Sequence, residues 1–467
     1  MIPDKTPQNF YLGGGGETLM TLPGAIILLI AGVLILSLRR KYVIIPVLLA
    51  IFLVPQGEIL VVSGFHLTPA RLIALFGWIR IIWTKFSSGS DVIGEAWNSI
   101  DSAFLLSEVC GSCAFILLWL QMGAVFNRIG SLWGILGIYF LLRHLIRDKQ
   151  DIYRAIKVFA VIAAINGVEM VHEQLKFQNL FGVYIGGVDI IPSLRDGKIR
   201  SQGTFGHPIL AGTFAATLLP LMLALWKSGN AKVIALVGLL SALSMVYTSA
   251  SSTPMLAIVA GLLGIFLWPV RRNMRVVRWS ILGFLVVSQI FMKAPVWFLI
   301  ARMDVLGASS GYHRAELVDV FIKHFFDWWL VGTRDGGSWG WEMFDLSNQY
   351  VSRGESGGLL AFIFFIVLIS RSFARLGKAR KSVAGRRSQE WLCWFLGAAL
   401  FAHVMGFFGI SYWDQTEVAW LALLAMISAA TAPTLVRTVA PRKPAAITEP
   451  EPADVSVSRW ETSGIPI

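Results

Sequence analysis

Two arginines stand in surroundings that suit the binding of an anion. Arg200 lies in the stretch IRSQGTFGHP, where two glycines allow close approach of the backbone to a ligand and Pro208 is a fitting first helical residue. Backbone amides that open a helix, with a guanidinium nearby, can hold an anion. Arg314 lies in GYHRAELVDVF, where apolar residues recur at helical spacing. Arg314 also has a plainer interpretation as an ordinary surface charge on an interfacial helix.

A histidine stands near each arginine. His207 directly precedes Pro208, and His313 directly precedes Arg314. Both stand beside an apolar segment, which is typical of a capping or interfacial imidazole. Either could instead transfer a proton, provided that a substrate hydroxyl lay within hydrogen-bond reach. The sequence leaves both interpretations open.

The elements that position these residues belong to a membrane protein. Of the 467 residues, 55% are hydrophobic and 15% are charged, whereas a soluble domain carries about 25% charged residues. The predicted fold class is an all-α polytopic membrane protein with about 12 transmembrane helices, in a range of roughly 11 to 13. The expected spans are 20–38, 42–57, 69–84, 103–121, 129–145, 155–172, 208–226, 231–247, 253–270, 279–298, 356–371, 391–410 and 415–433.

The net charge of +12 does not indicate a nucleic-acid partner, because the basic residues cluster in short loops beside apolar runs. With thirteen spans, the four basic groups at 39–41, 143–157, 271–278 and 371–387 share one face, which the positive-inside rule makes cytoplasmic. Arg200 and Arg314 then fall on the opposite face. Two anchored arginines there favour a diphosphate or another polyanionic ligand.

This topology divides the chain into seven segments, which alternate between the membrane and its two sides. They are an N-terminal segment (1–19), N-terminal transmembrane helices (20–172), an extracytoplasmic loop (173–207), central transmembrane helices (208–298), a large extracytoplasmic catalytic loop with short interfacial helices (299–355), C-terminal transmembrane helices (356–433) and a disordered cytoplasmic tail (434–467).

Ionisable residues inside the predicted spans are expected to be few, with His403 in one span and Glu417 near the end of another. Ion-coupled transporters usually carry buried carboxylates or broken helices near the middle of the membrane. The expected scarcity of ionisable residues therefore argues against an ion-coupled transporter without excluding one.

Four stretches, in order and with matching spacing, carry a resemblance to a known family. They are RSQGTFGHPILAGTFAATLLPL (200–221), YTSASSTPMLAIVAG (247–261), GYHRAELVDVFIKHFFDWWLVGT (311–333) and LSNQYVSRGESGGLLAFIFF (346–365). Together they resemble the motifs of the O-antigen ligase and O-antigen polymerase superfamily. The resemblance covers roughly residues 195–372.

The resemblance implies a multi-pass enzyme of the bacterial inner (cytoplasmic) membrane, active on its periplasmic face. Such enzymes transfer a glycan from undecaprenyl diphosphate to lipid A-core, to a growing glycan or to a protein. Membrane lipids and a chain-length regulator protein are further expected partners. The resemblance implies that Arg200 and Arg314 bind the diphosphate. No metal is expected, because the sequence has no cluster of Cys and His and because arginines can replace a divalent ion at the diphosphate, and no cofactor is expected either.

The chain departs from the family pattern at the position of the general base. Ser347 stands directly before Asn348, where a ligase has histidine, and a serine hydroxyl has no useful basicity near neutral pH. Ile209 replaces an asparagine, and TSASS lacks an arginine. The expected catalytic residues are His313, Asp345 and Glu355, and the expected positioning residues are His207, Ser347, Asn348 and Tyr350.

Polymerases tolerate change at that position, which favours an O-antigen or exopolysaccharide polymerase over an O-antigen ligase or a protein O-oligosaccharyltransferase. Two other classes stay open. A flippase or exporter of lipid-linked oligosaccharide should show internal repeats, and the sequence shows none. A non-catalytic assembly protein would explain the missing histidine.

Overall fold

The computed structural model describes residues 17–88, 97–195, 197–229, 231–303 and 310–432. Helices make up 76% of it. The strands of these residues form two antiparallel hairpins, which pair β1 (Leu60–Val62) with β2 (Phe65–Leu67) and β3 (Ser193–Arg195) with β4 (Lys198–Arg200). The predicted tail 434–467 and most of the predicted segment 1–19 lie outside the described residues.

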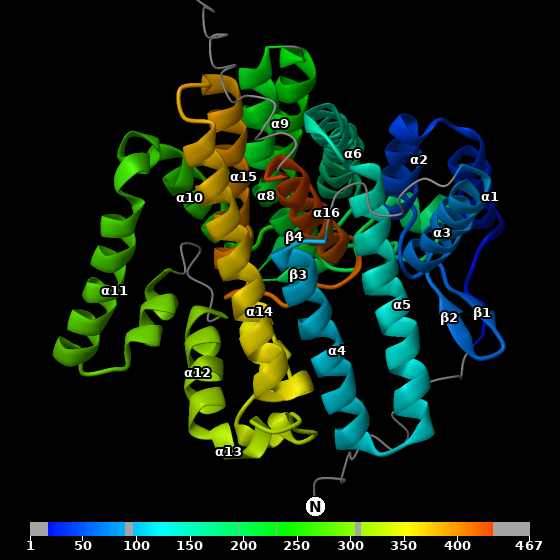
Figure 1. The fold of residues 1–467 in the computed structure, drawn as a ribbon. Helices are drawn as coiled ribbons and strands as arrows, with labels where there is room; N and C mark the ends of the chain where they lie inside the picture. The colour runs from blue at the N-terminus through cyan, green and yellow to red at the C-terminus, as the bar shows by residue number, and fades with distance from the viewer. Residues whose placement is uncertain (1–16, 89–96, 196, 230, 304–309, 433–467) are drawn as a thin grey trace, which may run out of the picture.

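Each predicted apolar segment falls on a helix (Figure 1). The α-helices are α1 (Leu22–Ser37), α2 (Arg40–Leu53), α3 (Pro69–Ser88), α4 (Ser99–Trp119), α5 (Met122–Leu145), α6 (Lys149–Lys176), α7 (Leu180–Tyr184), α8 (Pro208–Ser228), α9 (Lys232–Thr248), α10 (Ser252–Phe266), α11 (Met274–Phe291), α12 (Ser310–Lys323), α13 (Phe325–Trp328), α14 (Gln349–Ser382), α15 (Arg387–Gly406) and α16 (Asp414–Ala430). Short 3₁₀ helices cover Trp268–Asn273, Val296–Met303 and Gly336–Trp339.

Six described helices are long and apolar enough to cross a membrane. They are Ser99–Trp119, Met122–Leu145, Lys149–Lys176, Pro208–Ser228, Trp268–Phe291 and Gln349–Ser382. Large apolar side chains are exposed around the bundle, and α11, at the left margin of Figure 1, buries none of its residues. Such a surface suits lipid rather than water. These helices support a membrane-embedded protein, while the count of about 12 spans stays a prediction.

The core lies around α8 and α16, which are buried along most of their length. Phe52 of α2, Phe159 of α6 and Phe214 of α8 pack there with Phe205, which belongs to the turn before α8. Ring centroids in this cluster are 5.0 to 6.3 Å apart. The turn that follows Arg200 is therefore part of the core rather than a free loop.

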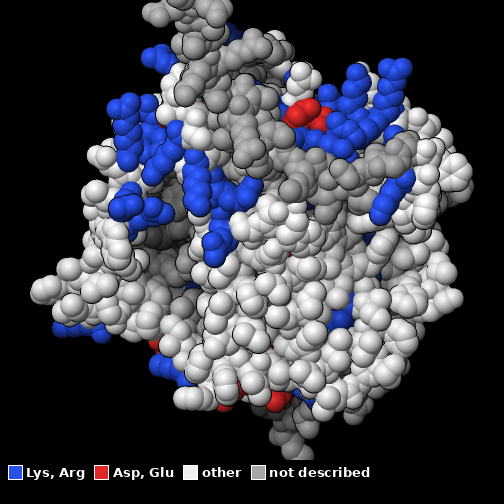
Figure 2. All heavy atoms as spheres, viewed as in Figure 1, with Lys and Arg blue, Asp and Glu red and all other residues white. Residues whose placement is uncertain are grey.

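The four basic groups share one end of the helix bundle, here called the basic end, where Lys and Arg gather at the top of Figure 2. Polar contacts join the groups to one another: Arg40 with Asp151, Lys149 with Ser388, and Arg271 and Arg380 with Glu390. The prediction that these groups lie on one face is thus confirmed as an arrangement within the molecule. The side of a membrane that the basic end faces stays a prediction.

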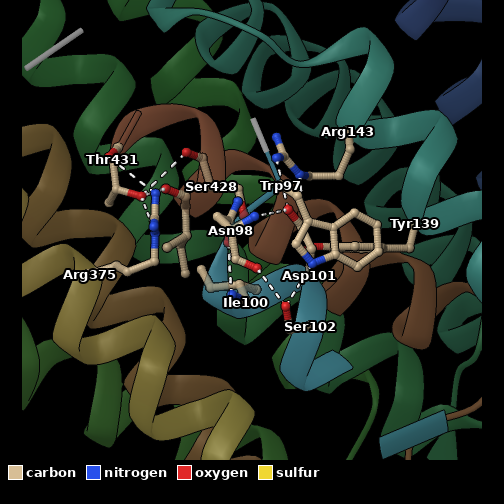
Figure 3. Close-up of polar contacts among 11 residues, drawn as sticks. Trp97, Asn98, Ile100, Asp101, Ser102, Tyr139, Arg143, Arg375, Ser428 and Thr431 are labelled. Carbon is tan, nitrogen blue, oxygen red and sulfur yellow. Dashed lines mark hydrogen bonds and ion pairs between the residues drawn. The ribbon is translucent and has the colours of Figure 1, made fainter. Parts of the chain in front are cut away.

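A buried ion pair fixes α4 against α5 (Figure 3). Nε and Nη2 of Arg143 donate to the two carboxylate oxygens of Asp101 at 2.9 and 3.1 Å. The Tyr139 hydroxyl donates to Asp101 at 2.6 Å, and the same carboxylate completes a capping box with Asn98 at the start of α4. Every carboxylate oxygen has a partner, so this cluster serves structure rather than ligand binding.

A sharp break divides α14 at Gly358, which has a φ of 69° and a ψ of −174°. The rings of Tyr350 and Phe365, on either side of the break, have centroids only 6.0 Å apart. A straight helix would separate them by about 22 Å. α14 is therefore a short arm (349–357) folded back against a long arm (359–382). The short arm begins inside the predicted loop 299–355.

We expect Gly358→Ala to destabilise the protein by about 2 kcal/mol or more. The new Cβ would lie 2.6 Å from the carbonyl oxygen of Leu330, and the backbone would keep a left-handed conformation. Gly377→Ala in the long arm is the control, because a Cβ there meets nothing within 4 Å. That change should stabilise by roughly 0.5 to 1 kcal/mol. Thermal unfolding in one detergent compares the two, and equal effects would contradict the break at Gly358.

Candidate functional site

The turn between β4 and α8 is held by side chains that bond its main chain. Glu173 of α6 accepts from the amide of Gly203 at 2.6 Å and from the preceding amide at 2.9 Å. Asn166 of α6 accepts from the amide of Thr204 at 3.1 Å, and Gln415 of α16 donates to the Thr204 carbonyl at 2.9 Å. Gly203 has a φ of 60°, which glycine adopts without strain. These hydrogen bonds fix the backbone of the turn and therefore the positions of the residues at its two ends.

The structure brings Arg200 and Arg314 to neighbouring serines at the start of α10. Nη2 of Arg200 donates to Oγ of Ser251 at 2.9 Å, and Nη1 of Arg314 donates to Oγ of Ser252 at 3.0 Å. Ser251 and Ser252 are consecutive residues, with Cα atoms about 3.8 Å apart, so the two guanidinium groups bond adjacent positions of the chain. Both arginines are 8% exposed. The prediction that they act at one place therefore has a geometric basis.

The surroundings of this pair are electropositive. Burial lowers the pKa of Arg200, and the nearby Arg195 lowers it further. Nε of Arg200 is buried and has no hydrogen-bond partner within the described part of the chain. Ser251, the N-cap of α10, makes no side-chain bond to the first amides of that helix, so the positive helix end adds to the guanidinium charges. An anion bound here would offset the unfavourable burial of these positive charges.

His207 caps α8 beside the arginine pair. Its Nδ1 accepts from the amide of Ile209 at 3.2 Å, so the proton of the neutral ring is on Nε2. Burial lowers the pKa of His207 from 6.5 to about 4, and the Arg200 charge adds to this effect while Asp345 opposes it. An imidazole that is neutral and such a weak base suits positioning by hydrogen-bond donation. The interpretation of His207 as a positioning residue is thus favoured.

His313 and Asp345 complete the cluster. Nε2 of His313 lies 3.4 Å from the main-chain carbonyl oxygen of Asp345. A carbonyl only accepts, so this contact places the proton on Nε2 and leaves Nδ1 as the basic atom. The Asp345 carboxylate is near enough to His207 to influence its pKa. We call Arg200, His207, His313, Arg314 and Asp345 the arginine site.

The remaining predicted positioning residues have structural contacts at the start of α14. Asn348 is fully buried and caps the helix, because its Oδ1 accepts from the amides of Tyr350 at 2.9 Å and Val351 at 3.3 Å. The Tyr350 hydroxyl donates to the Val404 carbonyl at 2.9 Å. The amide of Ser347 donates to the Asp345 carbonyl at 2.9 Å. These residues set the path of the chain that carries Asp345.

Glu355 lies apart from the arginine site. It stands on the short arm of α14, where its carbonyl accepts from the amide of Thr333 at 2.9 Å and its carboxylate packs against Gly336. These contacts are with the segment that carries Thr333 and Gly336 rather than with Arg200 or Arg314. Of the three predicted catalytic residues, the structure brings His313 and Asp345 together and leaves Glu355 outside.

The expected scarcity of ionisable groups in the spans is wrong, because Glu108 lies inside a predicted span and forms a charge network. Nη1 of Arg353, on the short arm, donates to Glu108 of α4 at 2.7 Å, and Nη2 lies 3.9 Å from Glu417 of α16. Electrostatic interactions extend the network from Glu108 to Arg128 and from Glu417 to Arg71. A lone glutamate in an apolar run was the available signal.

Comparison with known proteins leaves the arginine site to be interpreted from its chemistry. No protein-family model matches this chain, and no curated protein matches it.

The protein should become less stable as the pH is lowered, because His207 then becomes protonated. Because its pKa drops from 6.5 to about 4 on folding, the unfolded chain binds the proton more tightly. Its contribution to stability is complete above pH 6.5 and is lost as the pH falls to about 4. His207→Gln should flatten the pH dependence of the unfolding temperature across this window. His172→Gln, which removes an imidazole from α6, is the control, and equal profiles for the two variants would contradict the assignment.

Proposed function

We propose that this chain is a membrane glycosyltransferase that polymerises or transfers a glycan from undecaprenyl diphosphate on the extracytoplasmic face of a bacterial inner membrane. The observation that carries the proposal is the meeting of Arg200 and Arg314 at the start of α10, beside His313 and Asp345. The resemblance of residues 195–372 to O-antigen ligases and polymerases supports it. An O-antigen or exopolysaccharide polymerase is the favoured form.

In the proposed reaction, an acceptor hydroxyl oxygen bonds to the anomeric carbon of the donor glycan. The bond from that carbon to the diphosphate oxygen breaks, and undecaprenyl diphosphate leaves with the bonding electrons. Positive charge develops at the anomeric carbon and negative charge at the leaving oxygen. Arg200 and Arg314 stabilise the departing diphosphate, an effect that is large where water is partly excluded. The acceptor proton passes to a base of the arginine site.

His313 is the proposed base, with Asp345 as its neighbour. The main-chain carbonyl of Asp345 orients the ring so that Nδ1 can accept a proton. His207 fits a different task, since its Nδ1 is engaged by the α8 amide and its Nε2–H can hold a substrate oxygen. Glu355 is the weaker candidate because its contacts are with the outer loop. The histidine expected before Asn348 is thus replaced by one from α12.

Removal of either arginine should lower turnover at least about a hundredfold, because each donates to the leaving diphosphate. The variants are Arg200→Gln and Arg314→Gln, with Lys198→Gln and Lys323→Gln as controls of equal charge change on exposed side chains. The assay uses purified protein and a defined undecaprenyl-diphosphate-linked glycan without an added cation. Full turnover by both arginine variants would overturn the proposal. Long product ladders identify a polymerase, and a single transferred unit identifies a ligase.

We expect His313→Gln to lower turnover by about 10² to 10⁴, the range for loss of a general base. Glu355→Gln should keep most of the activity. The two variants are compared across pH in the same transfer assay, with the unfolding temperature of each as a check on folding. If Glu355→Gln, well folded, loses activity and His313→Gln does not, the base is Glu355.

A flippase or exporter of lipid-linked oligosaccharide is the second candidate. The network of Glu108, Arg353 and Glu417 among apolar helices favours it, since ionisable groups in such places often line a transport path. Transport of a lipid-linked glycan across proteoliposomes, without any new glycosidic bond, would select this function. The arginine site would then bind the same diphosphate without cleaving it.

A further inference from the structure

A cavity of about 750 Å³ lies at the basic end, apart from the arginine site. It is bordered by the end of α8, the Trp268–Asn273 turn and the connection from α14 to α15. Six basic side chains and one carboxylate line it. They are Lys227, Arg271, Arg272, Arg380, Lys381 and Arg387, with Glu390 as the carboxylate. Its size is that of a small-ligand site.

The single carboxylate is already engaged. Glu390 accepts from Nε of Arg271 at 3.0 Å and from Nη1 of Arg380 at 3.3 Å, and Arg380 also donates to the Arg271 carbonyl at 2.8 Å. Among the residues that the structure describes, no carboxylate forms an ion pair with Arg272, Lys381 or Arg387. The cavity thus has a clear excess of positive charge.

Two tryptophans hold part of this charge in place. The rings of Trp268 and Trp391 stack with centroids 3.6 Å apart and an angle of 14° between their planes. The Arg271 guanidinium lies 4.1 Å from the centre of the Trp268 ring, and Nζ of Lys227 lies 4.9 Å from that of Trp391. Tryptophan is enriched where membrane helices meet the headgroup layer. The cavity therefore combines fixed cations with an aromatic wall of interfacial type.

We propose that this cavity binds a phosphate-bearing anion, either the headgroup of an anionic phospholipid or a soluble polyphosphate. Basic pockets between membrane helices are suited to such headgroups. The cavity is distinct from the arginine site, because the two lie at opposite ends of α10: Ser252 contacts Arg314, and Trp268 follows Phe266. The proposal does not depend on glycosyl transfer.

The test measures the unfolding temperature of the detergent-purified full chain against ligand concentration, from which an apparent Kd follows. One arm titrates dioleoyl phosphatidylglycerol against dioleoyl phosphatidylcholine, and the other titrates inorganic pyrophosphate. The cavity variant is Arg272→Gln/Lys381→Gln/Arg387→Gln. The matched control is Arg275→Gln/Arg278→Gln/Lys378→Gln, which removes the same charge from residues that do not line the cavity.

We expect the wild-type chain to prefer phosphatidylglycerol or pyrophosphate over phosphatidylcholine. The cavity variant should bind the preferred ligand at least about tenfold more weakly, and the control should stay within about twofold. Binding of phosphatidylglycerol that pyrophosphate does not displace identifies a lipid headgroup. Binding of pyrophosphate alone identifies a soluble anion. The proposal fails if neither ligand is preferred, or if both triple variants weaken binding equally.

Discussion

Two positive charges held on neighbouring serines impose the main constraint on this structure. Arg200 and Arg314 come from distant segments of the chain, and both are buried, so that water screens each positive charge poorly. Such a pair needs a frame that keeps the side chains together. Glu173, Asn166 and Gln415 provide that frame on one side by bonding the turn after Arg200. The turn is therefore fixed by the protein itself, which would favour binding of the diphosphate that we propose as the ligand.

The histidines of the site differ in task because their backbones differ. His207 stands at a helix start, where an amide occupies one ring nitrogen and burial makes the ring a weak base. His313 lies within α12, where a carbonyl faces one nitrogen and leaves the other available. In the proposed reaction, histidine thus supplies both a hydrogen-bond donor and a base within the same cluster.

The sequence predicts the features that depend on neighbouring residues, and it does not predict contacts between distant segments. Apolar runs predict helices because the bilayer allows few other structures, and the settings of Arg200 and Arg314 predict that they bind an anion. Arg200 and Arg314 bond to Ser251 and Ser252 because of the tertiary arrangement of their segments around α10. A local sequence pattern does not predict this arrangement. The sequence shows Glu108 in an apolar run, but its pairing with Arg353 escapes prediction because the two residues are 245 positions apart. The fold-back at Gly358 escapes because an apolar run has the same pattern in a bent and in a straight helix.

The length of α10 limits how near the arginine site can lie to the membrane surface. Its 15 residues span about 22 Å, whereas the hydrocarbon layer of a bilayer is about 30 Å thick. If the basic end is level with one headgroup layer, the arginine site cannot reach the other. It then lies several ångströms below the opposite membrane surface. A lipid-linked diphosphate bound there, as we propose, would have to lie deeper than the headgroups of the neighbouring phospholipids.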